Sequence, residues 1–331
     1  MYFIRQFLLI TVPVLLLLFL LLEGLLRGAG YIPYYLNASA FVASQNQAIL
    51  YTLRHDFEGL YAGKRISINS QGFRGAALAK VESSVFRVAI IGDSIAFGQG
   101  VDEDETLPMQ LRVLLRRKLN SQAEVINLGV PGYDTCQESL RFEESLEKFR
   151  PHVAILVYFE NDTEPSLVTV RDGVVISSDV RTGLVGDFMA AMRKHSYAYN
   201  LVWSHWQVIK HRPSGVDEYS RVLAQRFSAN YSGWRKSKAC LADLISLARK
   251  QSIRFIVIPF PPMAGLSENP YPFESYITAV CDEANAATVE CLNVVPALQD
   301  PRLRLTVSHI EKHPSAEVLG KVAAQIEKVL P

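Results

Sequence analysis

The 331-residue sequence has almost no net charge and neither internal repeats nor low-complexity runs. Its 34 Lys and Arg residues balance its 33 Asp and Glu residues, which gives a net charge of +1 at pH 7. Domains that bind nucleic acid are usually strongly basic or carry a basic stripe, so no nucleic-acid partner is predicted. The composition, 49% hydrophobic and 20% charged, supports a large core and excludes global disorder.

Cysteine is scarce, with only Cys136, Cys240, Cys281 and Cys291 in the whole chain. The four form no C-x-x-C pair and have no zinc-ligand spacing, so no zinc site is predicted. Cys281 and Cys291 are close enough in sequence to pair if the domain lies in an oxidising compartment. Buried free thiols that act as small apolar residues are the alternative.

Charge is missing from Gln6 to Leu22, a Leu-rich stretch with Arg5 before it and Glu23 after it. Such a stretch is at the short end of the roughly 17–25 residues that span a bilayer. A cleaved signal peptide is the alternative, but the apolar run exceeds the usual core of about 7–15 residues and no small-x-small site follows it directly. We predict a tail (1–5), a single-pass anchor (6–26) and a membrane-proximal segment (27–80).

Apolar strand patterns alternate with helical patterns from Val85 to the C-terminus, which predicts an α/β fold. We expect a three-layer α/β/α sandwich of flavodoxin-like type over residues 81–331, with a parallel sheet between helices. An insertion at about 163–219 is too long for a plain loop. Its predicted helix, Asp187 to His211, either caps the site or packs on the sheet edge. The predicted strands are 86–91, 124–128, 153–159, 254–258 and 288–295; the predicted helices are 107–119, 137–149, one within 218–250, 273–284 and 315–329; and a hairpin is expected around Asp172-Gly173.

Four short polar blocks follow predicted strands or precede a predicted helix. A β-branched run ends in Gly92-Asp93-Ser94, the arrangement by which α/β enzymes expose a nucleophile, although it also suits an ordinary turn. The other three blocks are 127–132, 158–162 and 313–315. Ser94, Gly129, Asn161 and His313, in this order, resemble the blocks of the SGNH (GDSL-type) hydrolase family. The resemblance covers about residues 65–331, and the stretch Ile68 to Gly75 is similar to a lead-in of bacterial membrane-anchored members.

The resemblance implies roles for these residues. Ser94 is the nucleophile and His313 the base that takes its proton. The oxyanion hole comprises the backbone N–H groups of Ser94 and Gly129 and the side-chain amide of Asn161. Many members place an Asp three residues before the His, where this chain has Ile310. Glu311 is the nearest carboxylate and the expected third member of the triad. A Ser–His dyad is the alternative.

Neither a metal nor another cofactor is predicted. His309 and His313 have the spacing of helical metal ligands, but Pro314 disfavours a helix at His313. The leading hypothesis is a membrane-anchored esterase that hydrolyses O-acyl esters, above all O-acetyl esters, of a carbohydrate or lipid through an acyl-enzyme. The alternatives are an O-acetyltransferase for surface polysaccharide and a non-catalytic glycan-binding or assembly factor. The resemblance, rather than the nearly even balance of Arg5 and Arg27, implies a periplasmic catalytic domain. The oligomeric state is left open.

Overall fold

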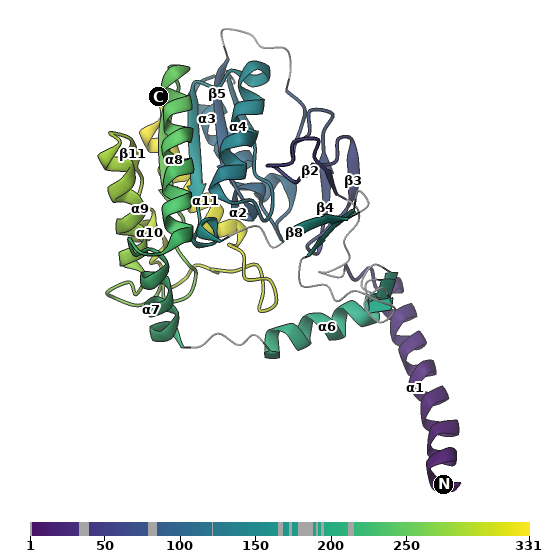
Figure 1. Cartoon of the computed structure of the whole chain (residues 1–331). Coiled ribbons are helices and arrows are strands. Elements are labelled where there is room, and N and C mark those ends of the chain that lie inside the picture. The colour runs from purple at the N-terminus through teal and green to yellow at the C-terminus, as the bar shows by residue number, and fades with distance from the viewer. Residues whose placement is uncertain are drawn as a thin grey trace. The chain divides into compact units, whose positions relative to one another are not determined.

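The computed structural model describes residues 2–32, 40–78, 85–120, 122–164, 168–171, 174–177, 188–189, 191–192, 195–210 and 215–331 (Figure 1). The chain divides into two compact units. The first comprises Met1–Ala38, Leu60–Arg65 and Val180–Arg212, and the second comprises Ser39–Gly59, Ile66–Asp179 and Pro213–Pro331. The boundaries divide the predicted membrane-proximal segment 27–80 and the predicted insertion 163–219 between the two units.

A five-stranded parallel sheet forms the centre of the second unit, in the order β11-β10-β7-β5-β6. β-branched and aliphatic residues dominate β5 and β7, and every residue of β7 is buried. Strands that are apolar on both faces need a covering layer on each side. The strands are β5 (Phe86–Gly92), β6 (Ala123–Asn127), β7 (Val153–Tyr158), β10 (Arg254–Pro259) and β11 (Glu290–Cys291).

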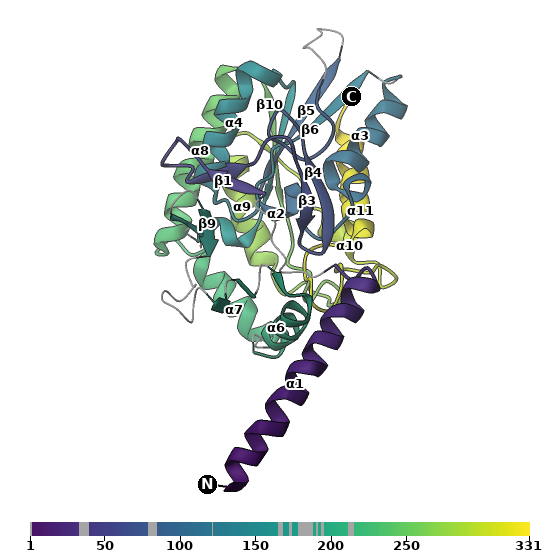
Figure 2. The same cartoon turned by 90° about the vertical axis from the view of Figure 1, so that its right-hand side faces the viewer.

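Helices cover both faces of this sheet, which confirms the predicted three-layer architecture. In Figure 2, α3 (Leu107–Lys118) and α11 (Ala316–Val329) lie on one side. The helices α4 (Thr135–Phe149) and α8 (Ser232–Lys250) lie on the other side, and α9 (Glu274–Ala286) packs near β10. Side-chain oxygens of Thr106, Asp134 and Ser315 accept backbone N–H groups at the first turns of α3, α4 and α11. These caps set the helix starts next to the ends of the strands.

Among the described residues, three two-stranded sheets accompany the five-stranded one. The pair β8 (Val168–Arg171) and β9 (Val174–Ser177) confirms the hairpin predicted here, although Asp172 and Gly173 at its tip lie outside the described residues. The other two pairs are β1 (Phe41–Ala43) with β2 (Tyr51–Leu53), and β3 (Phe57–Tyr61) with β4 (Lys64–Ile68).

One predicted strand is much shorter in the structure. The strand expected at 288–295 is only β11, because Asn293 accepts the Val295 N–H and starts the short helix α10 (Val295–Leu298). The helix expected within 218–250 is confirmed as α8, and a further helix, α7 (Val216–Arg226), precedes it across a turn at Phe227–Tyr231. The helix expected at 187–211 appears as α6 (Tyr197–Lys210), although parts of its predicted N-terminal half lie outside the described residues.

The first unit contains the long N-terminal helix α1 (Tyr2–Gly28). Its segment Leu9–Gly28 has a mean hydropathy of 2.6, and none of that segment is buried within the protein. Twenty such residues are long enough to cross a membrane, although signal sequences share this length and composition. This helix confirms the apolar N-terminal segment that the sequence predicts.

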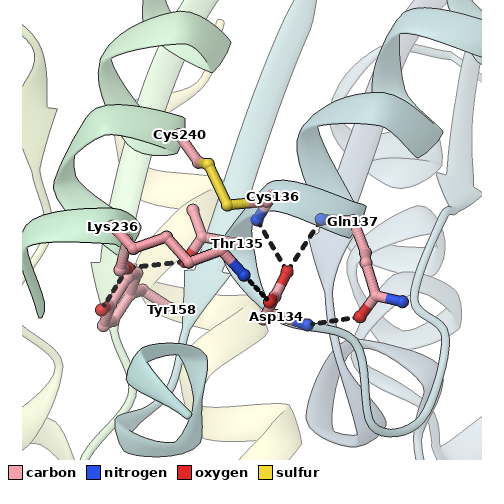
Figure 3. The surroundings of a disulfide bond; sticks show 8 residues. Asp134, Thr135, Cys136, Gln137, Tyr158, Lys236 and Cys240 are labelled. Atoms are coloured by element: carbon pink, nitrogen blue, oxygen red, sulfur yellow. Dashed lines mark hydrogen bonds and ion pairs between the residues drawn. A yellow bond between two sulfur atoms is a disulfide. The ribbon is translucent and has the colours of Figure 1, made fainter. Parts of the chain in front are cut away.

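All four cysteines form disulfides, and both bonds lie in the second unit. Cys281 pairs with Cys291, as the spacing suggested, and joins α9 to β11. Cys136 pairs with Cys240 across 104 residues and fastens α4 to α8 (Figure 3). The alternative of buried free thiols is therefore wrong.

Candidate active site

Strand β5 delivers Ser94 to the carboxyl edge of the sheet. The strand ends at Gly92, and Ser94 opens the one-turn helix α2 (Ser94–Phe97). Gly92 has φ +151°, and a Cβ there would lie 2.9 Å from the carbonyl oxygen of Val157. Only glycine therefore fits this turn. Asp93 caps α2 by accepting the Ile95 N–H at 2.9 Å, which holds Ser94 at the first helical position.

His313 reaches Ser94 from a tight loop before α11. The loop is closed by a bridge between Thr306 and Pro314 and by a 3.0 Å hydrogen bond from the Val307 N–H to the His313 carbonyl. The His313 Nε2 lies 2.7 Å from the Ser94 Oγ. The predicted nucleophile and the predicted base, 219 residues apart in sequence, are thus within hydrogen-bond reach.

Glu311 completes a hydrogen-bond chain with these two residues. Its Oε1 lies 2.5 Å from the His313 Nδ1 and also accepts the His313 backbone N–H at 3.0 Å. The Glu311 side chain is 6% exposed and packs against Gly100, where a Cβ would lie 2.8 Å from the Glu311 Cγ. The structure therefore brings Glu311, His313 and Ser94 together in the order that the sequence predicts.

Electrostatics favour a proton on His313. Burial lowers the pKa of His313, but its hydrogen bond to the Glu311 carboxylate and the charges of Glu311 and Asp93 outweigh burial, so the pKa is raised above its usual value of 6.5. A carboxylate on Nδ1 stabilises the imidazolium that forms when Nε2 takes a proton. It also leaves the neutral imidazole with its lone pair on Nε2, which faces Ser94.

Asn161 also lies at this edge of the sheet, in the 3-10 turn η2 (Glu160–Thr163) that follows β7. Its amide Nδ2 donates to the Asp93 Oδ2 at 2.9 Å, and the same oxygen lies 3.2 Å from the Ser94 Oγ. The second N–H of an amide can serve another acceptor. The Ser94 N–H opens α2, where no preceding turn supplies an acceptor. Asn161 and the Ser94 N–H are therefore near the nucleophile, and their role as oxyanion donors stays a prediction.

Gly129 lies close to α2 but its N–H has another partner. It follows β6, and its N–H donates to the Asn127 Oδ1 at 3.0 Å. A Cβ on Gly129 would lie 2.2 Å from the Phe97 N, so this position requires glycine for backbone packing. Its predicted role as a third oxyanion donor stays a prediction.

Comparison with known proteins adds a likeness to esterases. No family model matches the sequence, and no curated protein matches it significantly. A putative lipolytic protein of the G-D-S-L family from Desulfitobacterium hafniense DCB-2 has 17% identity and a TM-score of 0.40, covering 74% of this chain and 99% of that one. The esterase EstA from Pseudoalteromonas sp. has 12% identity and a TM-score of 0.42, covering 73% and 97%. The acetylxylan esterase Axe2 from Geobacillus stearothermophilus has 15% identity and a TM-score of 0.44, covering 76% and 95%.

The chain is similar to SGNH hydrolases. The blocks that contain Ser94, Asn161 and His313 meet at one edge of the sheet through the contacts described above. The Gly block packs beside them against the backbone of α2.

Three residues that support the SGNH blocks were not predicted. Arg74 is buried and donates to the carbonyls of Gly98 and Val101, so it holds the loop that follows α2. Asp93 contacts both Ser94 and Asn161. The Nε2 of Gln99 lies 3.4 Å from the His313 Nδ1. The only sequence signal for Arg74 was its place in the stretch Ile68 to Gly75, which is similar to the lead-in of bacterial membrane-anchored members.

Two buried carboxyl groups belong to the elements that surround Asp93. Glu138 of α4 and Asp162 of η2 are 1% and 3% exposed. Burial, followed by the charges of Asp162 and Asp93, raises the pKa of Glu138 well above its usual range. Burial and the charge of Asp93 raise the pKa of Asp162 in the same way. A raised pKa favours the neutral form of each carboxyl group, which lowers the negative charge around Asp93.

Helix α8 braces the turn that carries Asn161. Gly233, in its first turn, packs so closely that a Cβ would lie 2.0 Å from the Thr163 carbonyl oxygen. The Ser237 Oγ lies 2.8 Å from the Tyr158 hydroxyl and 2.8 Å from the Thr135 Oγ1. Beside this hydroxyl chain, Lys236 pairs with Asp134 at 2.8 Å, and the disulfide joins the same two helices. These contacts tie η2 to α4 and α8.

Proposed function

We propose that this protein is a serine ester hydrolase in which Ser94 is the nucleophile, His313 the general base and Glu311 the residue that orients His313. The observation that carries the proposal is the unbroken hydrogen-bond chain from Glu311 through His313 to Ser94. Its geometry is that of a Ser-His-acid triad, which recurs on unrelated folds.

The proposed reaction proceeds through an acyl-enzyme. As the Ser94 Oγ bonds to the ester carbonyl carbon, the His313 Nε2 takes the hydroxyl proton. The carbonyl oxygen becomes an oxyanion, which the Ser94 N–H and the Asn161 amide stabilise. The carbon–oxygen bond to the alcohol then breaks, and His313 returns the proton to the departing alkoxide. Water repeats these steps on the acyl-enzyme and releases the acid.

The proposed substrates are O-acyl esters, foremost O-acetyl esters, of a carbohydrate or lipid outside the cytoplasm. The apolar segment Leu9–Gly28 supports membrane anchoring, because its length and hydropathy suit a bilayer span. Two disulfides support an oxidising compartment for the catalytic unit. The catalytic domain would then act on surface or envelope esters while it remains tethered.

The test uses the full chain in detergent with a panel of p-nitrophenyl and sugar acetyl esters. Ser94→Ala and His313→Asn are expected to lower kcat on the order of 10⁴-fold or more. His309→Asn is the matched control, because His309 is exposed and lies outside the hydrogen-bond chain of Ser94, His313 and Glu311. A fluorophosphonate probe should label the wild-type chain and not Ser94→Ala. Equal turnover by wild type and Ser94→Ala, with both chains folded, would refute the proposal.

A second arm of this assay separates hydrolysis from acyl transfer. A glycan acceptor is added, and acetate is measured as free acid or as a glycan ester. Hydrolysis predicts free acetate at all acceptor concentrations. Acetate found mainly on the glycan would identify a transferase that uses the same acyl-enzyme.

A further inference from the structure

Helix α6 is fastened to the C-terminal end of α1 within the first unit. The carboxylate of Glu23 accepts hydrogen bonds from the Ser196 Oγ at 2.9 Å, the Tyr197 N–H at 3.1 Å and the Ala198 N–H at 2.9 Å. Glu23 thus caps the N-terminus of α6, where free N–H groups and the helix dipole favour a negative charge. Arg27 adds a 2.6 Å hydrogen bond to the His195 carbonyl.

The contact with Glu23 fixes the position along the axis of α1 at which α6 begins. Glu23 lies inside the apolar segment Leu9–Gly28, about 7 Å along the axis from Gly28 at 1.5 Å per residue. A carboxylate in such a segment is costly unless it is paired. Arg27 at 2.7 Å and the N-terminus of α6 pair with it. The start of α6 therefore lies beside the last turns of α1. With α1 in a bilayer, as proposed, this level would be the bilayer interface. Figure 1 shows α6 leading away from this end across the axis of α1.

The surface of α6 has the reverse of the usual polarity for a helix in water. Val202 is 63% exposed and Trp206 55% exposed, whereas the polar residues Asn200 and Ser204 are each 1% exposed. Tyr199, Val202, Trp203 and Trp206 have the spacing i, i+3, i+4, i+7 of one helix face. Tyr199 stacks on Trp203 with ring centroids 5.9 Å apart. An exposed apolar face of this kind favours an apolar medium rather than water.

We infer that the Tyr199–Trp206 face of α6 lies in the membrane interface, in contact with lipid, and that Glu23 holds it there. The lipid surface is the occupant that these contacts favour, because the face is continuous with a helix whose own apolar side chains are exposed. Tryptophan and tyrosine are the residues enriched at this depth of a bilayer. The inference rests on the proposed anchoring by α1 and is independent of the esterase chemistry.

Tryptophan fluorescence of the full chain in phosphatidylcholine vesicles tests this inference. The chain has three tryptophans, so Trp203→Phe with Trp234→Phe leaves Trp206 as the only emitter. Brominated acyl chains should quench most of its emission relative to ordinary lipid. The matched control, Trp203→Phe with Trp206→Phe, leaves only Trp234, which is 3% exposed in the core of the second unit and should not be quenched.

Glu23→Ala in the chain with Trp206 alone tests the clamp. This variant should still float with the vesicles, but the quenching of Trp206 should fall because α6 has lost its cap. Equal quenching with and without Glu23 would refute the clamp. If the chain with Trp206 alone floats but its emission is unquenched, the inference is overturned while the anchor stands; blue-shifted emission without quenching would then mean that protein rather than lipid covers this face. A chain that does not float would overturn both the anchor and the inference.

Discussion

Glu311 is the side chain that sets the protonation of the proposed base. His313 acts as a base only when it is neutral, and its pKa is raised above 6.5 by Glu311. The activity of the wild-type chain should therefore fall as the pH decreases through the raised pKa of His313. Glu311→Gln removes the charge. This change should shift the loss of activity to lower pH and reduce kcat by about 10²–10⁴-fold. The pH profile of kcat/KM measures both effects.

The control for this experiment is Glu290→Gln, which removes a carboxylate from a surface ion pair with Arg254. It should leave the pH profile and kcat unchanged. An unchanged profile in Glu311→Gln would mean that Glu311 does not orient His313, and the site would then be a Ser–His dyad.

Asn161 should act on the transition state rather than on substrate binding. Its amide is held beside Ser94 by Asp93, so its truncation removes one donor for the oxyanion. We expect Asn161→Ala to lower kcat by about 10²–10³-fold with little change in KM. Asn285→Ala is the matched control, because Asn285 is exposed at the end of α9. A rise in KM with an unchanged kcat would contradict the assignment.

At the residue scale, the sequence was sufficient for side chains whose partners lie close by along the chain. Glu311 could be predicted because it lies two residues from His313, and side chains so close in sequence easily come into contact. Arg74 could not, because its acceptors are backbone carbonyls 24 and 27 residues away that no pattern reveals. The partner of Gly129 was missed because a backbone N–H has no sequence signature.

At the scale of elements, the Cys136–Cys240 disulfide should contribute more to stability than Cys281–Cys291. It closes a loop of 104 residues rather than 10. Chain entropy predicts about 4.7 kcal/mol for the long loop and about 2.7 kcal/mol for the short one. Urea unfolding of two double variants, Cys136→Ala with Cys240→Ala and Cys281→Ala with Cys291→Ala, measures the difference. Each variant is the control for the other, and a larger loss for the short loop would contradict the entropic account.

Element boundaries and distant pairings were the weaker part of the sequence interpretation. The strand expected at 288–295 has a suitable apolar pattern, but the chain turns at Asn293, whose side chain accepts the Val295 N–H, and α10 begins at Val295. Cys136 and Cys240 meet only because α4 and α8 pack on the same face of the sheet, which their sequence positions do not show. Glu23 caps α6, 173 residues away, and its place after the uncharged stretch does not show this partner.

At the scale of the whole molecule, periodicity was enough to predict the layers. Strand runs such as β7 are apolar throughout, and the helices between them are amphipathic, so a covered parallel sheet follows. The uncharged run after Arg5 likewise predicted a separate apolar helix at the N-terminus. The side of the membrane did not, because Arg5 and Arg27 nearly balance across that run.

The disulfides give a test of which side the catalytic unit occupies. Because all four cysteines are paired, the chain taken from its native membrane and denatured should bind no maleimide before reduction and four equivalents after it. A variant that lacks residues 1–28 should stay in the cytoplasm, where thiols remain reduced, and should bind four equivalents without reduction. The mass shift of the labelled chain reads both results. Four reactive thiols in the anchored chain would place the catalytic unit on the reducing side and refute the proposed extracytoplasmic substrate.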